Sequence, residues 1–320
     1  MIDTLTQWLE GILDTPIEST QPIQPEASFR QFHRLRLAGG DTAIAMFAPP
    51  AREDSGRFVR LAHLLHAAGV PVPRIIASDH ERGLVLMEDL GTRHFADAYL
   101  QGDTERALTT AIDILGTLQR LPPSVVPAYT AQRLSDELEI FTNWFVTGLL
   151  GQESPPTWPN CVAALLGAVQ SQPVTVVHRD FHCRNLLLAI DGSPGVVDFQ
   201  DALAGPALYD LASLLRDCYW HFDDDTVRHW LGHYLARTPL HFDDPWQLLD
   251  LTALQRQLKA VGIFARLHLR DGKSTHLKYI PPVLEQCVLL AGRNAQTTVL
   301  GPWLNQLRVQ CITALADIVR

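Results

Sequence analysis

The chain has 320 residues, of which 47% are hydrophobic and 19% charged, a composition typical of a globular protein with a sizeable core. Its formal net charge of −9 argues against a nucleic-acid-binding surface, and no apolar run is long enough to predict a membrane-spanning helix. The N-terminus is acidic where a signal peptide is basic, and the five cysteines form no CxxC pair. We therefore expect a cytoplasmic protein with reduced thiols and neither a nucleic-acid nor a membrane partner.

Residues 1–90 have the pattern of a small antiparallel sheet with one main helix. The expected elements are a helix over 4–13, a strand edge or loop over 15–25, strands over 28–37 and 42–47, a helix over 57–68, and strands over 74–78 and 83–87. A Gly-Gly-Asp turn at residues 39–41 predicts a hairpin between the first two strands. Gly69 and Pro71 end the main helix.

Residues 91–320 consist mostly of long helical patterns. Helices are expected over 104–121, 130–150, 158–169, 207–219, 224–236, 245–269, 279–295 and 302–319. Residues 176–201 are the exception and read as strand, polar loop, strand, turn and strand. A small α+β part joined to a larger, mainly helical part predicts two lobes with a ligand-binding cleft.

The stretch 176–201, VVHRDFHCRNLLLAIDGSPGVVDFQD, holds side chains that suit phosphoryl transfer. Asp180 follows an apolar run, and a carboxylate on such a loop can accept or orient the proton of a substrate hydroxyl. Asn185 and Asp198 offer the hard oxygen ligands that Mg²⁺ prefers. Each residue alone is more often a turn or cap residue, but the ordered set is specific. The stretch therefore predicts a magnesium-dependent phosphotransferase.

HRDFHCRN followed by VVDFQDA resembles the catalytic and metal-binding loops of the aminoglycoside phosphotransferase and choline kinase family. The resemblance continues through SFRQFHRLRL, GVPVPRII with GLVLMEDLG, and GPALYDLASLLRDCY. LSDELEIFTNWFVTGLLG and QRQLKAVGIFARLHLRDGKSTHLKYI are most like the anomeric sugar kinases. Those enzymes phosphorylate the C1 hydroxyl of N-acetylmuramate and N-acetylglucosamine in bacterial cell-wall recycling.

The resemblance implies a two-lobed, protein-kinase-like α+β fold with a small antiparallel-sheet N-lobe and a large, mainly helical C-lobe. Residues 1–90 would then be the nucleotide-binding N-lobe. Residues 91–320 would carry the catalytic loop, the metal site and the substrate pocket. ATP and Mg²⁺ are the implied cofactors, a sugar and a nucleotide are the implied partners, and a monomer is expected.

The resemblance also implies roles for individual residues. Asp180 would be the catalytic base, with His178 bracing its loop, while Asn185 and Asp198 would hold Mg²⁺. Asp210 would brace the catalytic loop by hydrogen bonds. The further implied contacts are Ser28, Arg30, Glu88 and Leu90 for the nucleotide, and Arg184, Glu137, Trp144, Arg216, Asp217 and Arg266 for the sugar.

Several of these residues have a simpler interpretation. Trp144 shares its predicted helix with apolar residues and fits a core position. Arg266 fits a solvated helix charge, and Glu88 and Leu90 fit an ordinary linker. The sequence leaves open both the ligand contacts that the resemblance implies for these residues and their simpler structural roles.

Two features depart from the family pattern. No GxGxxG loop is present, and residues 26–30 occupy its place. The third strand, residues 42–47, contains no Lys to pair with nucleotide phosphates. These departures keep a non-catalytic pseudokinase open as an alternative, beside an aminoglycoside, choline or homoserine-type kinase.

Nearby arginines offer a replacement for the missing Lys. Arg30, Arg34 or Arg36 could supply the charge, since an Arg donates to phosphate through two N–H groups and stays charged. Glu53 or Asp54 would be the partner carboxylate, unless each is simply an acid at a helix N-terminus.

Overall fold

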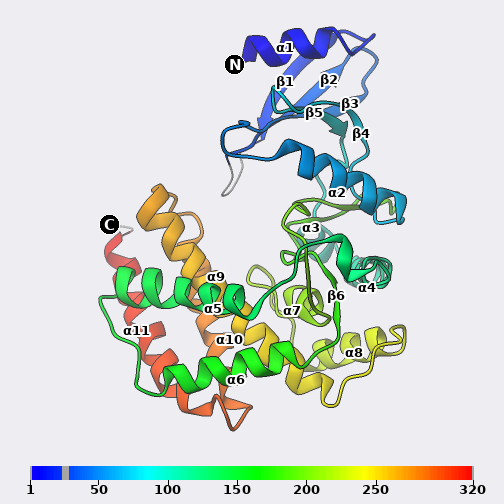
Figure 1. Cartoon of the computed structure of the whole chain (residues 1–320). Coiled ribbons are helices and arrows are strands. Elements are labelled where there is room, and N and C mark those ends of the chain that lie inside the picture. The colour runs from blue at the N-terminus through cyan, green and yellow to red at the C-terminus, as the bar shows by residue number, and fades with distance from the viewer. Residues whose placement is uncertain (1, 24–28, 319–320) are drawn as a thin grey trace. The chain divides into compact units, whose positions relative to one another are not determined.

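The computed structural model describes residues 2–23 and 29–318, and the chain forms two compact units (Figure 1). The first unit is Met1–Leu118 with Arg184–Asp201, and the second is Gln119–Cys183 with Ala202–Arg320. These limits differ from the linear division expected near residue 90. The assignment of nucleotide-binding and catalytic roles to residues 1–90 and 91–320 stays a prediction.

The first unit contains a five-stranded antiparallel sheet in the order β1-β2-β3-β5-β4. Its strands are β1 (Ile17–Ile23), β2 (Gln31–Leu37), β3 (Thr42–Phe47), β4 (Ile75–Asp79) and β5 (Leu84–Glu88). Its helices are α1 (Ile2–Glu10), α2 (Ser55–Ala67), α3 (Phe95–Leu100) and α4 (Thr104–Gln119). β1 is an edge strand, and this position tolerates Pro22 although proline has no N–H to donate to a neighbouring strand. The predicted sheet and main helix are confirmed.

Helix α1 covers one face of the sheet. Leu5 and Leu9 of α1 pack in one buried cluster with alternate residues of three strands. These strand residues are Leu35, Ala43, Ala45, Leu84 and Leu86. Residues two apart on a strand share a face, so this cluster is the core between helix and sheet.

Residues 184–201 fold as a short hairpin within the first unit. Strands β7 (Leu186–Leu188) and β8 (Pro194–Val196) pair antiparallel. Arg93 ties β7 to the unit, because its Nη1 donates to the Leu188 carbonyl at 2.9 Å and its own carbonyl accepts the Leu188 N–H at 3.0 Å. Phe199 stacks on Phe58 of α2 at 4.9 Å between ring centroids. The hairpin is therefore anchored at both of its ends.

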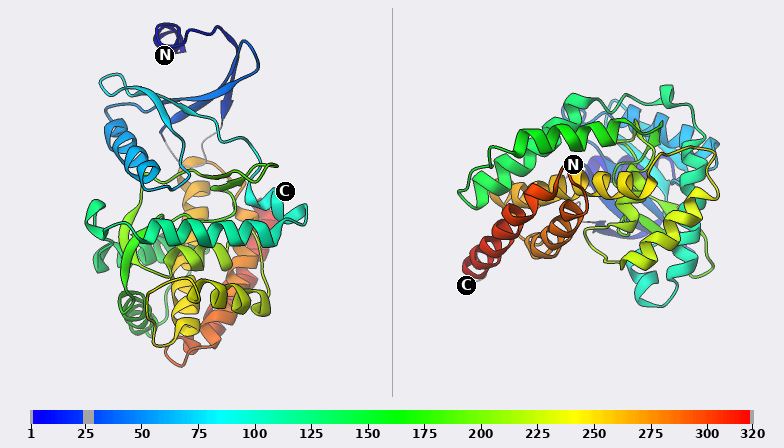
Figure 2. Two further views of the ribbon diagram at one scale, coloured as in Figure 1. Left: turned by 90° about the vertical axis from the view of Figure 1, so that its right-hand side faces the viewer. Right: turned by 90° about the horizontal axis from the view of Figure 1, so that it is seen from below.

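The second unit is mainly helical. Its helices are η1 (Pro123–Val125), α5 (Ala131–Ile140), η2 (Phe141–Leu149), α6 (Trp158–Gln170), α7 (Tyr209–Leu215), α8 (Asp224–Leu235), α9 (Pro245–Asp271), η3 (Leu277–Tyr279), α10 (Ile280–Gly292), η4 (Thr298–Leu300) and α11 (Gly301–Ile318). Strands β6 (Val174–Val177) and β9 (Leu203–Pro206) form a separate antiparallel pair. The long helix α9 packs against α5, η2, α6, α7 and α10 and is the centre of the unit (Figure 2).

Two predicted helices differ from the structure. The helix expected over 130–150 is α5 followed by the π-helical η2. This transition lies where α9 crosses the α5–η2 junction, and at Gly262 the backbones of the two helices are in close contact. The helix expected over 207–219 is reduced to α7, because Arg216 leaves helical geometry and Asp217 turns its carboxylate to backbone N–H groups.

Gly262 is required at the crossing of α9 with the α5–η2 junction. A Cβ at this position would lie 2.5 Å from the Phe141 nitrogen and 2.6 Å from the Ile140 carbonyl oxygen. We expect Gly262→Ala to destabilise the protein by about 1–3 kcal/mol, because backbone must move to admit the methyl group. Thermal unfolding of the purified protein measures the effect.

Gly232 provides the matched control, since it lies within helix α8 and a Cβ there meets nothing within 4 Å. Gly232→Ala is expected to stabilise the protein by roughly 0.5–1 kcal/mol through reduced chain entropy. Equal melting temperatures for both variants would show that the crossing tolerates a side chain.

Two expectations from composition can be compared with the structure. Along residues 2–23 and 29–318, no helix combines the length and the apolar character needed to cross a membrane. All five cysteines are free and buried, as predicted for thiols that fill the core.

Candidate active site

The loop after β6 has a strained backbone that is held by buried hydrogen bonds. Arg179 adopts φ of 78°, a region that non-glycine residues rarely occupy. The Asp210 carboxylate accepts the backbone N–H of His178 at 2.6 Å and that of Arg179 at 2.8 Å. The Asp180 N–H donates to His178 Nδ1 at 3.3 Å. Asp210 and His178 therefore make the hydrogen bonds expected of residues that brace this loop, and the catalytic role of the loop stays a prediction.

Asp180, the predicted base, lies in a positively charged environment. Burial alone raises the pKa of its carboxyl group. Nearby cations outweigh burial and hold the pKa well below its usual value. In order of effect these cations are Lys259, His182, Arg256 and Arg179. The carboxylate therefore stays ionised near neutral pH, in the form that accepts a hydrogen bond from a substrate hydroxyl.

A buried ion cluster lies beside this loop, around Glu137. Arg179 Nη2 lies 2.5 Å and Lys259 Nζ lies 3.3 Å from Glu137 Oε1. The Tyr129 hydroxyl donates to Glu137 Oε2 and lies 3.1 Å from the Tyr209 hydroxyl. Burial raises the pKa of Glu137, but Lys259 and Arg179 lower it below its usual value. Glu137 therefore acts as a shared internal counter-ion, a role that the sequence did not predict.

The pKa of Asp180 predicts how kcat depends on pH. A carboxylate with a depressed pKa is fully ionised above its unfolded value of 3.8 and is protonated only as pH falls through its lower folded value. We expect no acid limb from Asp180 above about pH 5 in the wild-type kcat profile. In Lys259→Met the limb is expected to move to higher pH, because the largest of the charges that lower the pKa of Asp180 is removed. Lys259→Arg should restore the original profile, and identical profiles in all three proteins would contradict this assignment.

The predicted metal ligands come from one end of the β7–β8 hairpin. The Val197 N–H donates to the Asn185 carbonyl at 3.0 Å, so the residues flanking the paired strands lie opposite each other. Asp198 follows with φ of 65°, which redirects the chain, and Gln200 Nε2 donates to Asp198 Oδ1 at 2.5 Å. An amide and a carboxylate oxygen at one hairpin end fit Mg²⁺, which often takes one or two protein ligands plus phosphate and water.

The three arginines considered for the missing Lys have different partners. Arg30 donates to Glu53 Oε2 through Nε at 3.1 Å and Nη2 at 2.9 Å, and both side chains are largely buried. Arg34 is committed to Asp89 through a bidentate pair at 2.7 and 3.0 Å. Arg36 makes an exposed pair with Glu18 at 3.9 Å. Arg30 with Glu53 is therefore the arginine–carboxylate pair that matches the sequence expectation.

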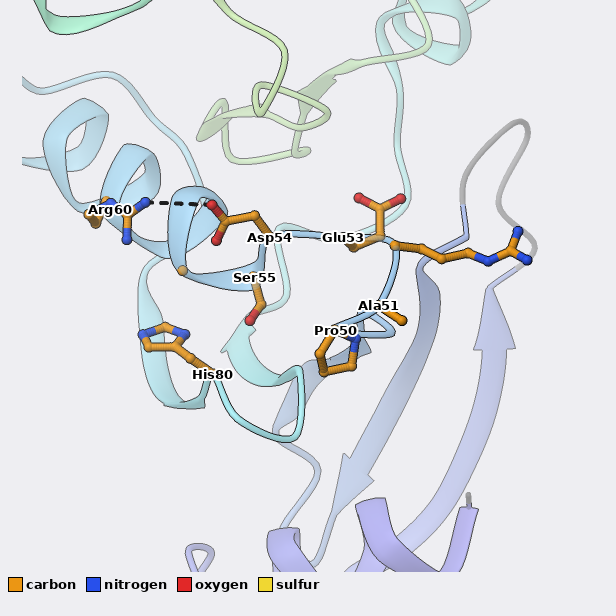
Figure 3. A pocket seen from close by; sticks show the side chains of 9 residues that line it. Pro50, Ala51, Glu53, Asp54, Ser55, Arg60 and His80 are labelled. Atoms are coloured by element: carbon orange, nitrogen blue, oxygen red, sulfur yellow. Dashed lines mark ion pairs between the residues drawn. The ribbon is translucent and has the colours of Figure 1, made fainter.

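Asp54 is an acid at a helix N-terminus, which was the alternative to pairing with an arginine. Its side chain accepts the Arg57 N–H at 2.8 Å and caps helix α2. Asp54 also lines a shallow pocket of about 480 Å³ at the start of this helix, with Ser55, Arg60 and His80 (Figure 3). Glu53, the partner of Arg30, also lines this pocket, whereas none of the residues predicted for catalysis or metal binding does.

The other predicted nucleotide contacts lie at the end of β5. Glu88 Oε2 accepts the Arg74 N–H at 3.2 Å. The Leu90 side chain lies against Gly195 of β8, where a Cβ would be 3.0 Å from Leu90 Cδ1. Ser28 lies outside the described residues. The Arg34–Asp89 pair and an Arg34 bond to the Gly91 carbonyl at 2.9 Å hold this segment.

Two of the predicted sugar contacts have internal partners. Arg216 pairs with Asp224 at 2.9 Å and with Asp250 at 3.1 Å, and only 4% of its surface is exposed. Asp217 accepts the N–H groups of Cys183 and Tyr219, each at 2.8 Å. Both residues therefore stabilise the fold around the catalytic loop, and a direct sugar contact by either stays a prediction.

The remaining sugar candidates are Trp144, Arg184 and Arg266, and all three are partly exposed. Trp144 lies on η2, and Arg266 lies on α9 near Arg270, whose charge adds to burial in lowering the pKa of Arg266. Their predicted contacts with a sugar stay predictions.

Comparison with known proteins identifies the family. Residues 19–246 match the family model described as the phosphotransferase enzyme family. The chain is 36% identical over 311 residues to the N-acetylmuramate/N-acetylglucosamine kinase of Pseudomonas aeruginosa, covering 93% of this chain and 91% of that protein. It is 34% identical over 319 residues to the protein of the same name from Neisseria meningitidis, covering 95% of each. The chain belongs to the phosphotransferase enzyme family and is an ATP-dependent phosphotransferase.

Solved structures agree in fold. The chain is similar to the choline kinase of Streptococcus pneumoniae with a TM-score of 0.64, at 12% identity, over 90% of this chain and 99% of that one. It is also similar to an aminoglycoside phosphotransferase solved with ADP and hygromycin B, with a TM-score of 0.65, at 12% identity, over 92% and 99%. The predicted kinase-like α+β fold is confirmed.

Proposed function

We propose that the protein is an ATP-dependent kinase for the anomeric hydroxyl of N-acetylmuramate and N-acetylglucosamine, acting in bacterial cell-wall recycling. The observation that carries the substrate class is the identity of 36% to a kinase of that name over more than nine-tenths of both chains. The ionised Asp180 on its braced loop supports the reaction type. We also propose that the protein acts as a cytoplasmic monomer.

In this proposal Asp180 orients the C1 hydroxyl of the sugar. The hydroxyl oxygen forms a bond to the γ-phosphorus of ATP, the bond to the bridging oxygen breaks, and ADP leaves. The hydroxyl proton passes to Asp180. Because the pKa of Asp180 is low, the carboxylate takes the proton late in the transfer and acts mainly by holding the nucleophile in position.

Asn185 and Asp198 would hold Mg²⁺, which when bound neutralises phosphate charge. Gln200 orients the Asp198 carboxylate by its hydrogen bond. Arg30, held by Glu53, would contact the nucleotide phosphates in place of the missing Lys. Glu88 and Leu90 would present backbone groups to the adenine.

The role of Arg30 can be tested by kinetics. We expect Arg30→Gln to raise KM for ATP by roughly tenfold, since a charge-assisted hydrogen bond to phosphate is lost, and Glu53→Gln to raise it less. KM for the sugar should change little. Arg36→Gln is the matched control, because Arg36 is an exposed arginine of β2, the strand that follows Arg30, and its ion pair with Glu18 is long, at 3.9 Å. An unchanged KM for ATP in Arg30→Gln would contradict the assignment.

A coupled ADP-release assay tests the proposed function. The acceptors are N-acetylmuramate, N-acetylglucosamine, choline, homoserine and an aminoglycoside. Turnover on the two amino sugars supports the proposal. Turnover only on another acceptor would overturn the substrate class, and Mg²⁺-independent ATP binding without turnover would favour a pseudokinase. The cations around Asp180 disfavour a polycationic aminoglycoside as the acceptor.

A further inference from the structure

An aromatic cluster in the second unit includes His182, one of the groups around Asp180, and otherwise has no part in the chemistry described so far. Tyr219 and Tyr279 meet edge to face with ring centroids 5.0 Å apart, and the His182 ring lies 5.2 Å from that of Tyr219. These three side chains are partly exposed. Beneath them, Phe264 and His276 are buried and stack at 5.3 Å. We refer to these five residues as the aromatic platform.

The aromatic platform is fixed to the catalytic loop by two links. His182 lies two residues after Asp180 in the same loop. The Asp217 carboxylate accepts the N–H groups of both Cys183 and Tyr219, and it joins the end of the loop to the platform. Because Asp217 is only 3% exposed, this link is rigid, and the exposed edges of the platform have a fixed position relative to the base.

Arg256 of α9 lies beside this platform and lacks a contact counter-ion. The guanidinium is 5% exposed, and its Nη1 donates to the Cys218 thiol at 3.8 Å. It forms no ion pair within 4.0 Å with any residue of the described chain, whereas Lys259, one turn later, pairs with Glu137. Its charge acts on Asp180 and on Asp217 at longer range. A buried charge is normally paired, so an anionic group supplied by a ligand would complete this site.

Resting on the proposed function, we propose that the aromatic platform is the acceptor-sugar subsite and that Arg256 pairs with an acidic substituent of the sugar. The apolar face of a pyranose ring stacks on tyrosine rings, whose hydroxyl groups also donate to sugar oxygens. Of the two sugars, N-acetylmuramate carries a lactyl carboxylate and N-acetylglucosamine does not. Arg256 therefore favours the acidic sugar, while the platform serves both.

Kinetics of Tyr219→Leu and Tyr279→Leu test the platform. Each variant is expected to raise KM for both sugars by about tenfold, with KM for ATP unchanged. The Leu side chain at residue 219 leaves the backbone N–H that bonds Asp217 in place. Trp144→Leu is the comparison, because Trp144 is the partly exposed tryptophan first considered for stacking. A raised sugar KM in Trp144→Leu alone, or unchanged KM values in both Tyr variants, would overturn the platform assignment.

The charge of Arg256 is tested with the two sugars as a pair. Arg256→Gln is expected to raise KM for N-acetylmuramate at least about tenfold more than KM for N-acetylglucosamine, and Arg256→Lys is expected to reduce that difference. In case the Gln variant does not fold, the wild-type enzyme is assayed with the methyl ester of N-acetylmuramate. Loss of the lactyl charge should raise KM relative to the free acid. Equal changes for both sugars, or equal KM values for acid and ester, would overturn the role of Arg256.

The wild-type assay separates this inference from the proposed function. If the wild-type enzyme turns over neither amino sugar, both proposals are overturned. If it turns over both sugars and the platform and Arg256 variants behave like wild type, only the subsite is overturned.

Discussion

Replacing Asp180 with alanine is expected to lower kcat by about 10²–10⁴-fold on every acceptor, because no other group would then hold the attacking hydroxyl. The affinity for ATP should remain, since this carboxylate contacts the hydroxyl and not the nucleotide in the proposed reaction. Single-turnover kinetics and nucleotide titration measure the two effects separately. The change also removes a negative charge from among Lys259, His182 and Arg256, so a thermal melt is needed alongside.

The control for this experiment is Asp136→Ala, which removes an exposed carboxylate of α5 in the same unit. It is expected to leave kcat and KM unchanged. Near wild-type turnover by the Asp180 variant would show that another residue positions the hydroxyl, and loss of ATP binding would show that Asp180 organises the nucleotide site.

Glu137→Gln is expected to destabilise the protein by about 3–5 kcal/mol, because it removes the carboxylate that Arg179 and Lys259 share while both remain buried. For a protein of this size the melting temperature should fall by roughly 6 °C or more. The loop that carries Asp180 should loosen as well, since Arg179 belongs to it. Thermal unfolding and the sugar KM are measured on the same preparation.

Glu139→Gln is the matched control, being an exposed glutamate two residues further along α5. It is expected to change stability by less than about 0.5 kcal/mol. An unchanged melting temperature together with a raised sugar KM in Glu137→Gln would restore Glu137 as the sugar ligand first expected from the sequence.

Much of the candidate site could be proposed from the sequence because its residues are local in the chain. The strand over 42–47 has the predicted limits, since a short apolar run bounded by turn residues defines it. The predicted ligands Asn185 and Asp198 flank one hairpin, so their spacing alone brings them to the same end. The pairing of Arg30 with Glu53 could be stated only as one option among several.

The counter-ion role of Glu137 could not be predicted from spacing. Its partner Arg179 is 42 positions away, and Lys259 lies on another helix. The same holds for the aromatic platform, whose rings come from the catalytic loop, α9, η3 and the segment after α7. The π-helical η2 was also missed, because its amphipathic pattern looks like that of an α-helix until α9 crosses it at Gly262.

The features that the sequence predicted differ from those it missed in the range of the interactions that form them. Turn chemistry, capping and strand alternation act between residues close in sequence. The loop at residues 178–180 and the hairpin between Asn185 and Asp198 can therefore be predicted from the sequence. Buried charges are different, because each must be compensated by whatever the packed interior brings near it. For Arg179, Lys259 and Arg256 only the packing of α9 beside the catalytic loop decides which carboxylate, if any, each cation meets.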